Sequence, residues 1–177
     1  MSVPDIFDRK TLRIKRNRAA AHYADHDFLI RETAIRLLDR LRDMNKDFKS
    51  ILVIGSHGGL MQKLLHDMGY QNCIVMDYAH VMNPDVIADE EYLPIAANTL
   101  DCVISHMMLP VVNDVPGVLA QIRYALKPDG LFLGTTLGVN TLSNVQHAML
   151  QSELELKNQK YPYYLQQKKF WKVYQAL

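Results

Sequence analysis

The chain has 177 residues, of which 49% are hydrophobic and 22% are charged, and its formal net charge at pH 7 is +1. This length is typical of one domain with a sizeable core, and a nearly neutral chain is not expected to be a dedicated nucleic-acid binder. No hydrophobic run approaches the roughly 20 residues of a membrane span, and the first residues lack the hydrophobic segment of a signal peptide.

The chain begins with a basic segment and continues into an amphipathic helix. Hydrophobic residues recur at helical spacing from Ile30 to Met44, which predicts a helix there. We expect residues 1–48 to form a helical lid with a solvated basic face, the alternative being a surface for an acidic partner or a phosphate backbone. Six cations follow one another without an intervening acid: Arg9, Lys10, Arg13, Lys15, Arg16 and Arg18.

The segment that follows alternates between predicted strands and helices. Strands are expected at 51–54, 73–76, 86–88, 101–105 and 131–135, and helices at 61–68, 115–122 and about 141–157. A turn at Lys127–Gly130 is expected to separate the helix at 115–122 from the last strand. This alternation predicts a doubly wound α/β fold with a mainly parallel sheet and right-handed crossovers.

Cysteine and histidine spacing gives little sign of a metal site. Cys73 and Cys102 lie in separate hydrophobic runs, so we expect buried, reduced thiols and a cytoplasmic location. His22 and His26 are four residues apart, as in a metal pair on a helix, but no third ligand is visible and no metal is predicted.

A glycine-rich segment, Gly55-Ser56-His57-Gly58-Gly59, joins the first predicted strand to the following helix. Strand, glycine-rich turn and helix are the opening of a Rossmann-type cofactor site, where the glycines let the backbone approach the ligand. His57 stands at the centre of this G-x-G-x-G pattern, in the place of a glycine. The loop predicts a nucleotide-like cofactor.

Polar residues end the next three predicted strands. A carboxylate at the end of the second strand, as Asp77 is, can accept hydrogen bonds from the ribose hydroxyls of NAD or of an adenosyl sulfonium. Asp89 and Glu90 follow the third strand, where the alternative is the start of a solvated loop. Ser105 and His106 end the fourth strand, and His106 is either a general base or a half-buried structural histidine.

The segment after the third strand resembles a known family. Ala88–Pro94 reads ADEEYLP and is similar to the A-D-E-x-L-P-F segment of class I S-adenosylmethionine-dependent methyltransferases. The likeness continues through Asn98–Asp101 to Leu126–Leu131 and covers residues 5–157. Ile6–Arg9 and Arg18–Ala20 resemble the branch with biotin-synthesis methyltransferases and the mitochondrial complex I assembly factor that hydroxylates an arginine of a partner subunit.

The resemblance implies a Rossmann-like sheet in the order 3-2-1-4-5 and S-adenosylmethionine as the cofactor. The acid after the third strand would bind the adenine amino group, and the methyl group would pass to a small-molecule or protein acceptor that the sequence does not identify. No catalytic residue is assigned. The predicted cofactor-binding residues are Gly55, Ser56, His57, Gly59, Asp77, Tyr78, Asp89, Glu90, Ser105 and His106.

Three features depart from the family pattern. Val53 stands where the family has an acid that fixes the amino-acid end of the cofactor. His57 carries a side chain in a turn that favours glycine if its φ is positive. The family's last two strands are not evident in the aromatic and basic tail, residues 158–177, so we expect this tail or a second copy to cover the edge of the fifth strand.

These departures leave alternatives to a methyltransferase that binds S-adenosylmethionine. The first is a respiratory complex I assembly-factor-like protein related to the arginine hydroxylase, which the segment Ile6–Arg9 favours. The second is a non-catalytic interaction domain on the methyltransferase fold, which Val53 and His57 favour. The predicted organisation is a lid at 1–48, a cofactor-binding core at 49–157 and the tail, with a homodimer through the tail or the fifth-strand edge as an open alternative.

Overall fold

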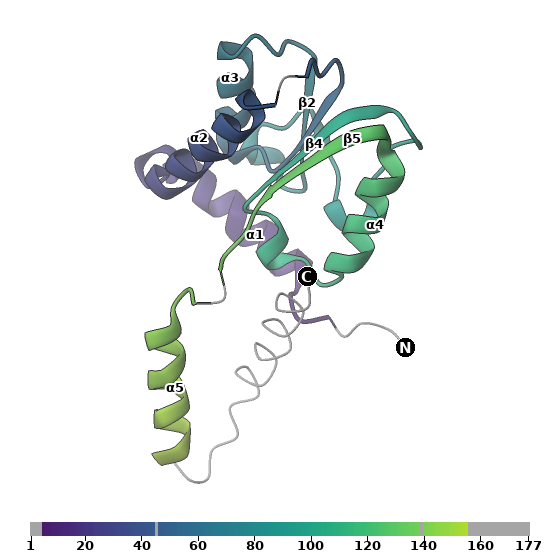
Figure 1. The fold of residues 1–177 in the computed structure, drawn as a ribbon. Coiled ribbons are helices and arrows are strands. Elements are labelled where there is room, and N and C mark those ends of the chain that lie inside the picture. Colours follow the sequence, from purple (N-terminus) through teal and green to yellow (C-terminus); the bar gives the residue numbers. More distant parts are fainter. Residues whose placement is uncertain (1–4, 45, 139, 156–177) are drawn as a thin grey trace. The chain divides into compact units, whose positions relative to one another are not determined.

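The computed structural model describes residues 5–44, 46–138 and 140–155, and the chain divides into two compact units. The first unit ends at Thr136 and holds a five-stranded sheet with helices on both sides (Figure 1). The described part of the second unit holds one helix, α5 (Ser143–Glu155), which agrees with the prediction as far as residue 155. The tail at 158–177 lies outside the described residues, and so does its predicted cover over the fifth strand.

The sheet is parallel throughout and has the predicted order β3-β2-β1-β4-β5. Ile54, the last residue of β1, lies opposite Met76 of β2 and Ser105 of β4, so the carboxyl ends of the central strands meet at one edge. The strands are β1 (Ile51–Ile54), β2 (Cys73–Asp77), β3 (Val86–Ile87), β4 (Leu100–His106) and β5 (Leu126–Thr135).

Helices cover both faces of the sheet, which is why β1 and most of β4 are buried hydrophobic runs. Leu41 of α2 and Leu65 of α3 share one hydrophobic cluster with Val53 of β1. Val118 and Ile122 are buried from α4, which Figure 1 shows on the opposite side of the sheet. The α-helices of this unit are α1 (Arg9–Ala19), α2 (Phe28–Arg42), α3 (Leu60–Asp67) and α4 (Val115–Ala125).

The expected turn at Lys127–Gly130 is wrong as a separate element, because β5 begins at Leu126, directly after α4. Leu126 pairs with Leu100 and Leu131 pairs with Cys102, so the register shifts between these two pairs. Two ammonium groups hold the irregular segment to its neighbours, with Lys127 at 2.8 Å from Asp101 and Lys46 at 2.7 Å from Asp129. The segment thus pairs with β4 through Leu126 and Leu131 despite its turn-like composition.

The third strand is shorter than predicted, because Ala88 lies beyond its end at Ile87. The Ala88 amide still donates to the Asp77 carbonyl oxygen at 3.2 Å, and edge strands are commonly this short. Cys73 and Cys102 are free and buried, as predicted. Among the helices in the described ranges, none is long and hydrophobic enough to cross a membrane.

Candidate functional site

The predicted cofactor residues all lie at the carboxyl edge of the sheet, where loops leave β1, β2, β3 and β4. In doubly wound folds, ligands bind in the crevice outside these strand ends. Direct contacts connect the loops. The Ser56 amide donates to the Asp77 carboxylate at 3.0 Å, and the His57 ring meets the His106 carbonyl oxygen at 2.7 Å.

The glycine loop has the left-handed backbone that its sequence predicts. Gly55 and Gly59 have φ values of 99° and 86°, and His57 has a φ of 47°. A side chain at such an angle costs about 1–2 kcal/mol in free energy, so the predicted strain at His57 is present. A Cβ atom added to Gly55 would lie 2.6 Å from Cγ of Met108, so that position requires glycine.

The His57 side chain is only 3% exposed and joins the loop to two other segments. Its Nε2 donates to the His106 carbonyl oxygen at 2.7 Å, and its Nδ1 accepts from the Tyr23 hydroxyl. Burial, with a smaller contribution from the positive charge of Arg16, lowers the pKa of His57 to about 3. The imidazole is therefore neutral at physiological pH and fills the centre of the loop.

The carboxylate of Asp77 is buried and its hydrogen-bonding capacity is fully used. Oδ1 accepts from Nε of Arg16 at 3.2 Å and from the Ala79 amide at 2.9 Å. Oδ2 accepts from Nη2 of Arg16 at 2.8 Å and from the Ser56 amide at 3.0 Å. The acid predicted to bind ribose thus holds a bidentate arginine from α1.

The acids after β3 hold a second arginine of the same helix. Nη2 and Nε of Arg9 donate to the two Asp89 oxygens at 2.7 and 3.1 Å. The same Nη2 lies 2.8 Å from Oε1 of Glu90, an ion pair without hydrogen-bonding geometry. Glu90 is 1% exposed, and burial raises its pKa to about 6 although Arg9 acts in the opposite direction.

Tyr78 lies beneath both arginines of α1. The guanidinium carbon of Arg9 is 4.6 Å from the centre of the Tyr78 ring, and that of Arg16 is 5.7 Å from it. Cations at such distances over an aromatic face are attracted by the ring's electron density. The expectation of a solvated basic face is thus wrong for these two arginines, although Lys10, Arg13, Lys15 and Arg18 are exposed.

The residues at the end of β4 are buried and incompletely paired. Nε2 of His106 lies 3.0 Å from the Thr33 hydroxyl, while its Nδ1 has no hydrogen-bond partner among the described residues. Burial lowers the pKa of His106 to about 4, so this ring is also neutral near pH 7. The hydroxyl of Ser105 likewise lacks a partner in the described part of the chain.

Whether a polar ligand fits the edge can be judged from its buried polar atoms that have no hydrogen-bond partner among the described residues. Buried polar groups normally have a hydrogen-bond partner, so Oε2 of Glu90, the Ser105 hydroxyl and Nδ1 of His106 suit the hydroxyl and amino groups of an adenosyl ligand. Val53 does not contribute a charge, because its side chain lies in the hydrophobic core. The edge has the donors and acceptors for such a ligand, but α1 holds two of its carboxylates.

Sequence reasoning missed four residues at this edge: Arg9, Arg16, Tyr23 and Thr33. One signal was available for the arginines. Arg9 and Arg16 are seven residues apart, which is two helical turns, so they share one face of α1. Nothing in the spacing of Tyr23 or Thr33 indicated a histidine partner in a distant loop.

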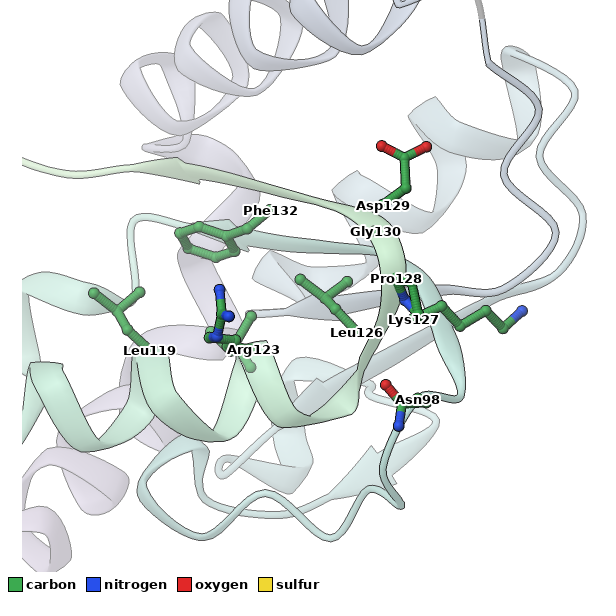
Figure 2. A pocket seen from close by; sticks show the side chains of 10 residues that line it. Asn98, Leu119, Arg123, Leu126, Lys127, Pro128, Asp129, Gly130 and Phe132 are labelled. Carbon is green, nitrogen blue, oxygen red and sulfur yellow. The ribbon is translucent and has the colours of Figure 1, made fainter.

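A separate pocket of about 550 Å³ lies between α4 and β5, away from the predicted cofactor residues (Figure 2). Figure 2 shows the Arg123 side chain between Leu119 and Leu126. Its lining is formed by Asn98, Leu119, Ile122, Arg123, Leu126, Lys127, Pro128, Asp129, Gly130 and Phe132. None of the residues predicted from sequence as a cofactor contact takes part.

Comparison with known proteins identifies the family to which the chain is similar. A model of the family described as a methyltransferase domain matches residues 21–176. The chain is 35% identical over 166 residues to the mitochondrial arginine-hydroxylase NDUFAF5 of Rattus norvegicus, covering 85% of this chain and 48% of the relative. It is 30% identical over 163 residues to the malonyl-(acyl-carrier protein) O-methyltransferase of Gallionella capsiferriformans, covering 81% of this chain and 56% of the relative. The chain thus spans about half the length of these curated relatives.

Solved structures share the fold at low sequence identity. A proposed S-adenosyl-L-methionine-dependent methyltransferase from Methanococcus maripaludis aligns with a TM-score of 0.60 at 16% identity, covering 80% of this chain and 74% of that chain. Phosphoethanolamine N-methyltransferase 2 of Haemonchus contortus, solved with S-adenosylhomocysteine, aligns with a TM-score of 0.52 at 20% identity, covering 64% and 32%. These alignments show the fold.

Proposed function

Because the chain belongs to the methyltransferase domain family, we propose that the carboxyl edge of its sheet binds S-adenosylmethionine and that it transfers the methyl group to an acceptor. The observation that carries this proposal is the position of Asp77, which ends β2 and accepts from the glycine loop through the Ser56 amide. A carboxylate so placed suits the ribose hydroxyls of a nucleoside.

Each predicted residue takes a role in this proposal. The cofactor supplies an electrophilic methyl carbon when it is bound. Asp77 would accept from the ribose, and Asp89 or Glu90 would accept from the adenine amino group. Gly55 gives the loop its left-handed turn beside Met108, and burial at this edge would exclude water from the reacting groups. His106 is the candidate general base because its Nδ1 has no hydrogen-bond partner among the described residues, but with a pKa lowered to about 4 it would be a weak base near pH 7.

Relatedness to NDUFAF5 favours a second candidate function. The curated relative at 35% identity bears the name arginine-hydroxylase. In this second candidate function, the substrate of the site would be an arginine of a protein. A non-catalytic interaction domain is the third candidate, favoured by Val53 and by the arginines on the predicted cofactor acids. The identity of the acceptor and a homodimer stay proposals. A cytoplasmic location is also a proposal, which the buried free thiols support.

Calorimetric titration with S-adenosylhomocysteine tests cofactor binding. We expect the wild-type chain to bind and Asp77→Asn to bind at least tenfold more weakly, because a charged hydrogen-bond acceptor is worth about 1.5–3 kcal/mol in free energy. Asp47→Asn is the matched control, since Asp47 is exposed and away from the site, and it should leave affinity unchanged. Equal affinities for wild type and Asp77→Asn would contradict the assignment of Asp77.

A further inference from the structure

Helix α1 contacts every carboxylate that the proposed function assigns to the adenosine part of the cofactor. Arg16 holds Asp77 through two hydrogen bonds, and Arg9 holds Asp89 and lies against Glu90. The two arginines are two helical turns apart on one face, so a single rigid helix places both. One structural element therefore controls access to three acids that come from two different loops.

Arginine and ribose would compete for the same atoms of Asp77. A carboxylate offers about four acceptor positions, and those of Asp77 are taken by Arg16, the Ala79 amide and the Ser56 amide. The two backbone donors belong to the loops that build the site and stay with it. Ribose hydroxyls can therefore reach Asp77 only when the Arg16 guanidinium leaves.

Polar contacts rather than a buried hydrophobic face attach α1 to the sheet. No residue of α1 is buried, so hydrophobic packing contributes little to holding it on the sheet. Its attachment is polar: the two arginines, the Asn113 side chain that accepts from the Ile6 and Phe7 amides at 2.7 Å, and the Tyr23–His57 contact just beyond its end. Ion pairs removed from water gain little net free energy, because desolvation offsets much of their attraction.

We propose that α1 is an autoinhibitory lid, in which Arg9 and Arg16 occupy the cofactor carboxylates and must be displaced before the cofactor binds. This inference rests on the proposed function. Bound cofactor and docked arginines are mutually exclusive, so the measured affinity is the intrinsic affinity multiplied by the fraction of chains with α1 released. The other cations of α1, Lys10, Arg13, Lys15 and Arg18, stay exposed while the lid is closed.

Calorimetric titration of the full chain with S-adenosylhomocysteine separates the possibilities. Arg9→Gln/Arg16→Gln should bind at least tenfold more tightly than the wild type, because release of α1 no longer competes with the ligand. The matched control is Arg13→Gln/Arg18→Gln, which removes the same charge from exposed positions of the same helix and should leave affinity unchanged. Arg16→Lys keeps the charge but lacks the bidentate guanidinium, so it should bind the ligand with intermediate affinity. This single variant tests the same contact if the double variant does not fold.

Equal or weaker binding by the double variant would overturn the lid, and weaker binding would instead identify the arginines as cofactor ligands. If neither the wild type nor any variant binds at millimolar ligand, the proposed function itself fails, and the lid fails with it. Amide hydrogen exchange gives a second readout on the unmodified chain. Ligand should speed exchange over Arg9–Ala19 and slow it in β1 and β2, whereas slower exchange in α1 would contradict displacement.

Discussion

The His57 side chain fills the centre of the glycine loop and joins it to Tyr23 and to the His106 backbone. Its positive φ of 47° could be predicted, because the position belongs to a glycine in the loop pattern. Its hydrogen bonds could not be predicted, because Tyr23 and His106 are distant in the sequence and neither spacing nor composition indicates a contact with His57. The residue is therefore a structural part of the closed loop, and its predicted cofactor contact stays a prediction.

Replacing His57 by glycine tests whether the ring restricts the site. His57→Gly should bind S-adenosylhomocysteine about tenfold more tightly by calorimetry, because it removes the ring that fills the loop. The free energy of unfolding should fall by at most about 1 kcal/mol, since the loss of two buried hydrogen bonds at about 1 kcal/mol each is largely offset by the roughly 1–2 kcal/mol of strain relieved at the positive φ. His57→Asn tolerates the backbone angle but keeps a side chain, so it should gain less affinity. Unchanged or weaker binding by His57→Gly would contradict this role for the ring.

Two buried neutral histidines make stability depend on pH. The folded chain holds the pKa of His57 at about 3 and that of His106 at about 4, mainly through burial, compared with 6.5 for an exposed histidine. As the pH is lowered below 6.5, the unfolded chain therefore takes up two protons that the folded chain does not. The free energy of unfolding falls as a result. Glu90 acts in the opposite direction between pH 6 and 4.5, because burial raises its pKa to about 6 in the folded chain.

Because two histidines oppose one glutamate, the free energy of unfolding falls by about 1.4 kcal/mol for each pH unit between pH 6 and 4.5, and the slope becomes smaller above pH 6.5, where the histidines of the unfolded chain are also neutral. Urea unfolding at pH 7, 6 and 5 measures this free energy. His106→Gln should reduce this slope by about 1.4 kcal/mol per pH unit, because it removes one of the two protons that the unfolded chain takes up. A free energy of unfolding that is constant or rises between pH 7 and 5 would show that the two rings are not held neutral.

At the scale of elements, the sheet could be predicted almost completely. Hydrophobic runs that end in polar residues mark β1, β2 and β4, and alternation with helices fixes a parallel sheet whose predicted order is confirmed. The family predicted from Ala88–Pro94 and the neighbouring motifs is confirmed as well. The start of β5 was predicted too late, because Pro128 and Gly130 are typical of a turn and the pairing of Leu126 with Leu100, far away in the sequence, is not visible in the composition.

Helix α1 marks the limit of what the sequence could establish. The arginines face acids that are 61 and 80 residues away along the chain, and a pattern of cations alone does not distinguish a docked face from a solvated one. The positions of the acids at the ends of β2 and β3 were predicted correctly. That prediction concerned hydrogen bonds to a cofactor and did not include the arginines. Their occupation by α1 is the main feature that the structure adds to the prediction.

At the scale of the whole molecule, the chain spans about half the length of its curated relatives, and its proposed cofactor edge lies within that half. In the described ranges β5 pairs with β4 alone, so its other side is an edge of the sheet. A homodimer through this edge stays a prediction, and so does the division into a lid at 1–48, a core at 49–157 and a tail. The acceptor is likewise a proposal, because fold alone does not fix chemistry.

In the proposed function, the carboxyl edge of the sheet binds an adenosyl cofactor through Asp77. Thermal unfolding with and without S-adenosylhomocysteine tests it most directly. Ligand at 100 times its dissociation constant should stabilise the chain by about 2.7 kcal/mol and raise the unfolding midpoint by roughly 5–10 °C. At the same ligand concentration, Asp77→Asn should show about half of this shift or less, because its affinity is expected to be at least tenfold weaker. No shift of the wild-type midpoint at millimolar ligand, or an equal shift in the variant, would contradict the account.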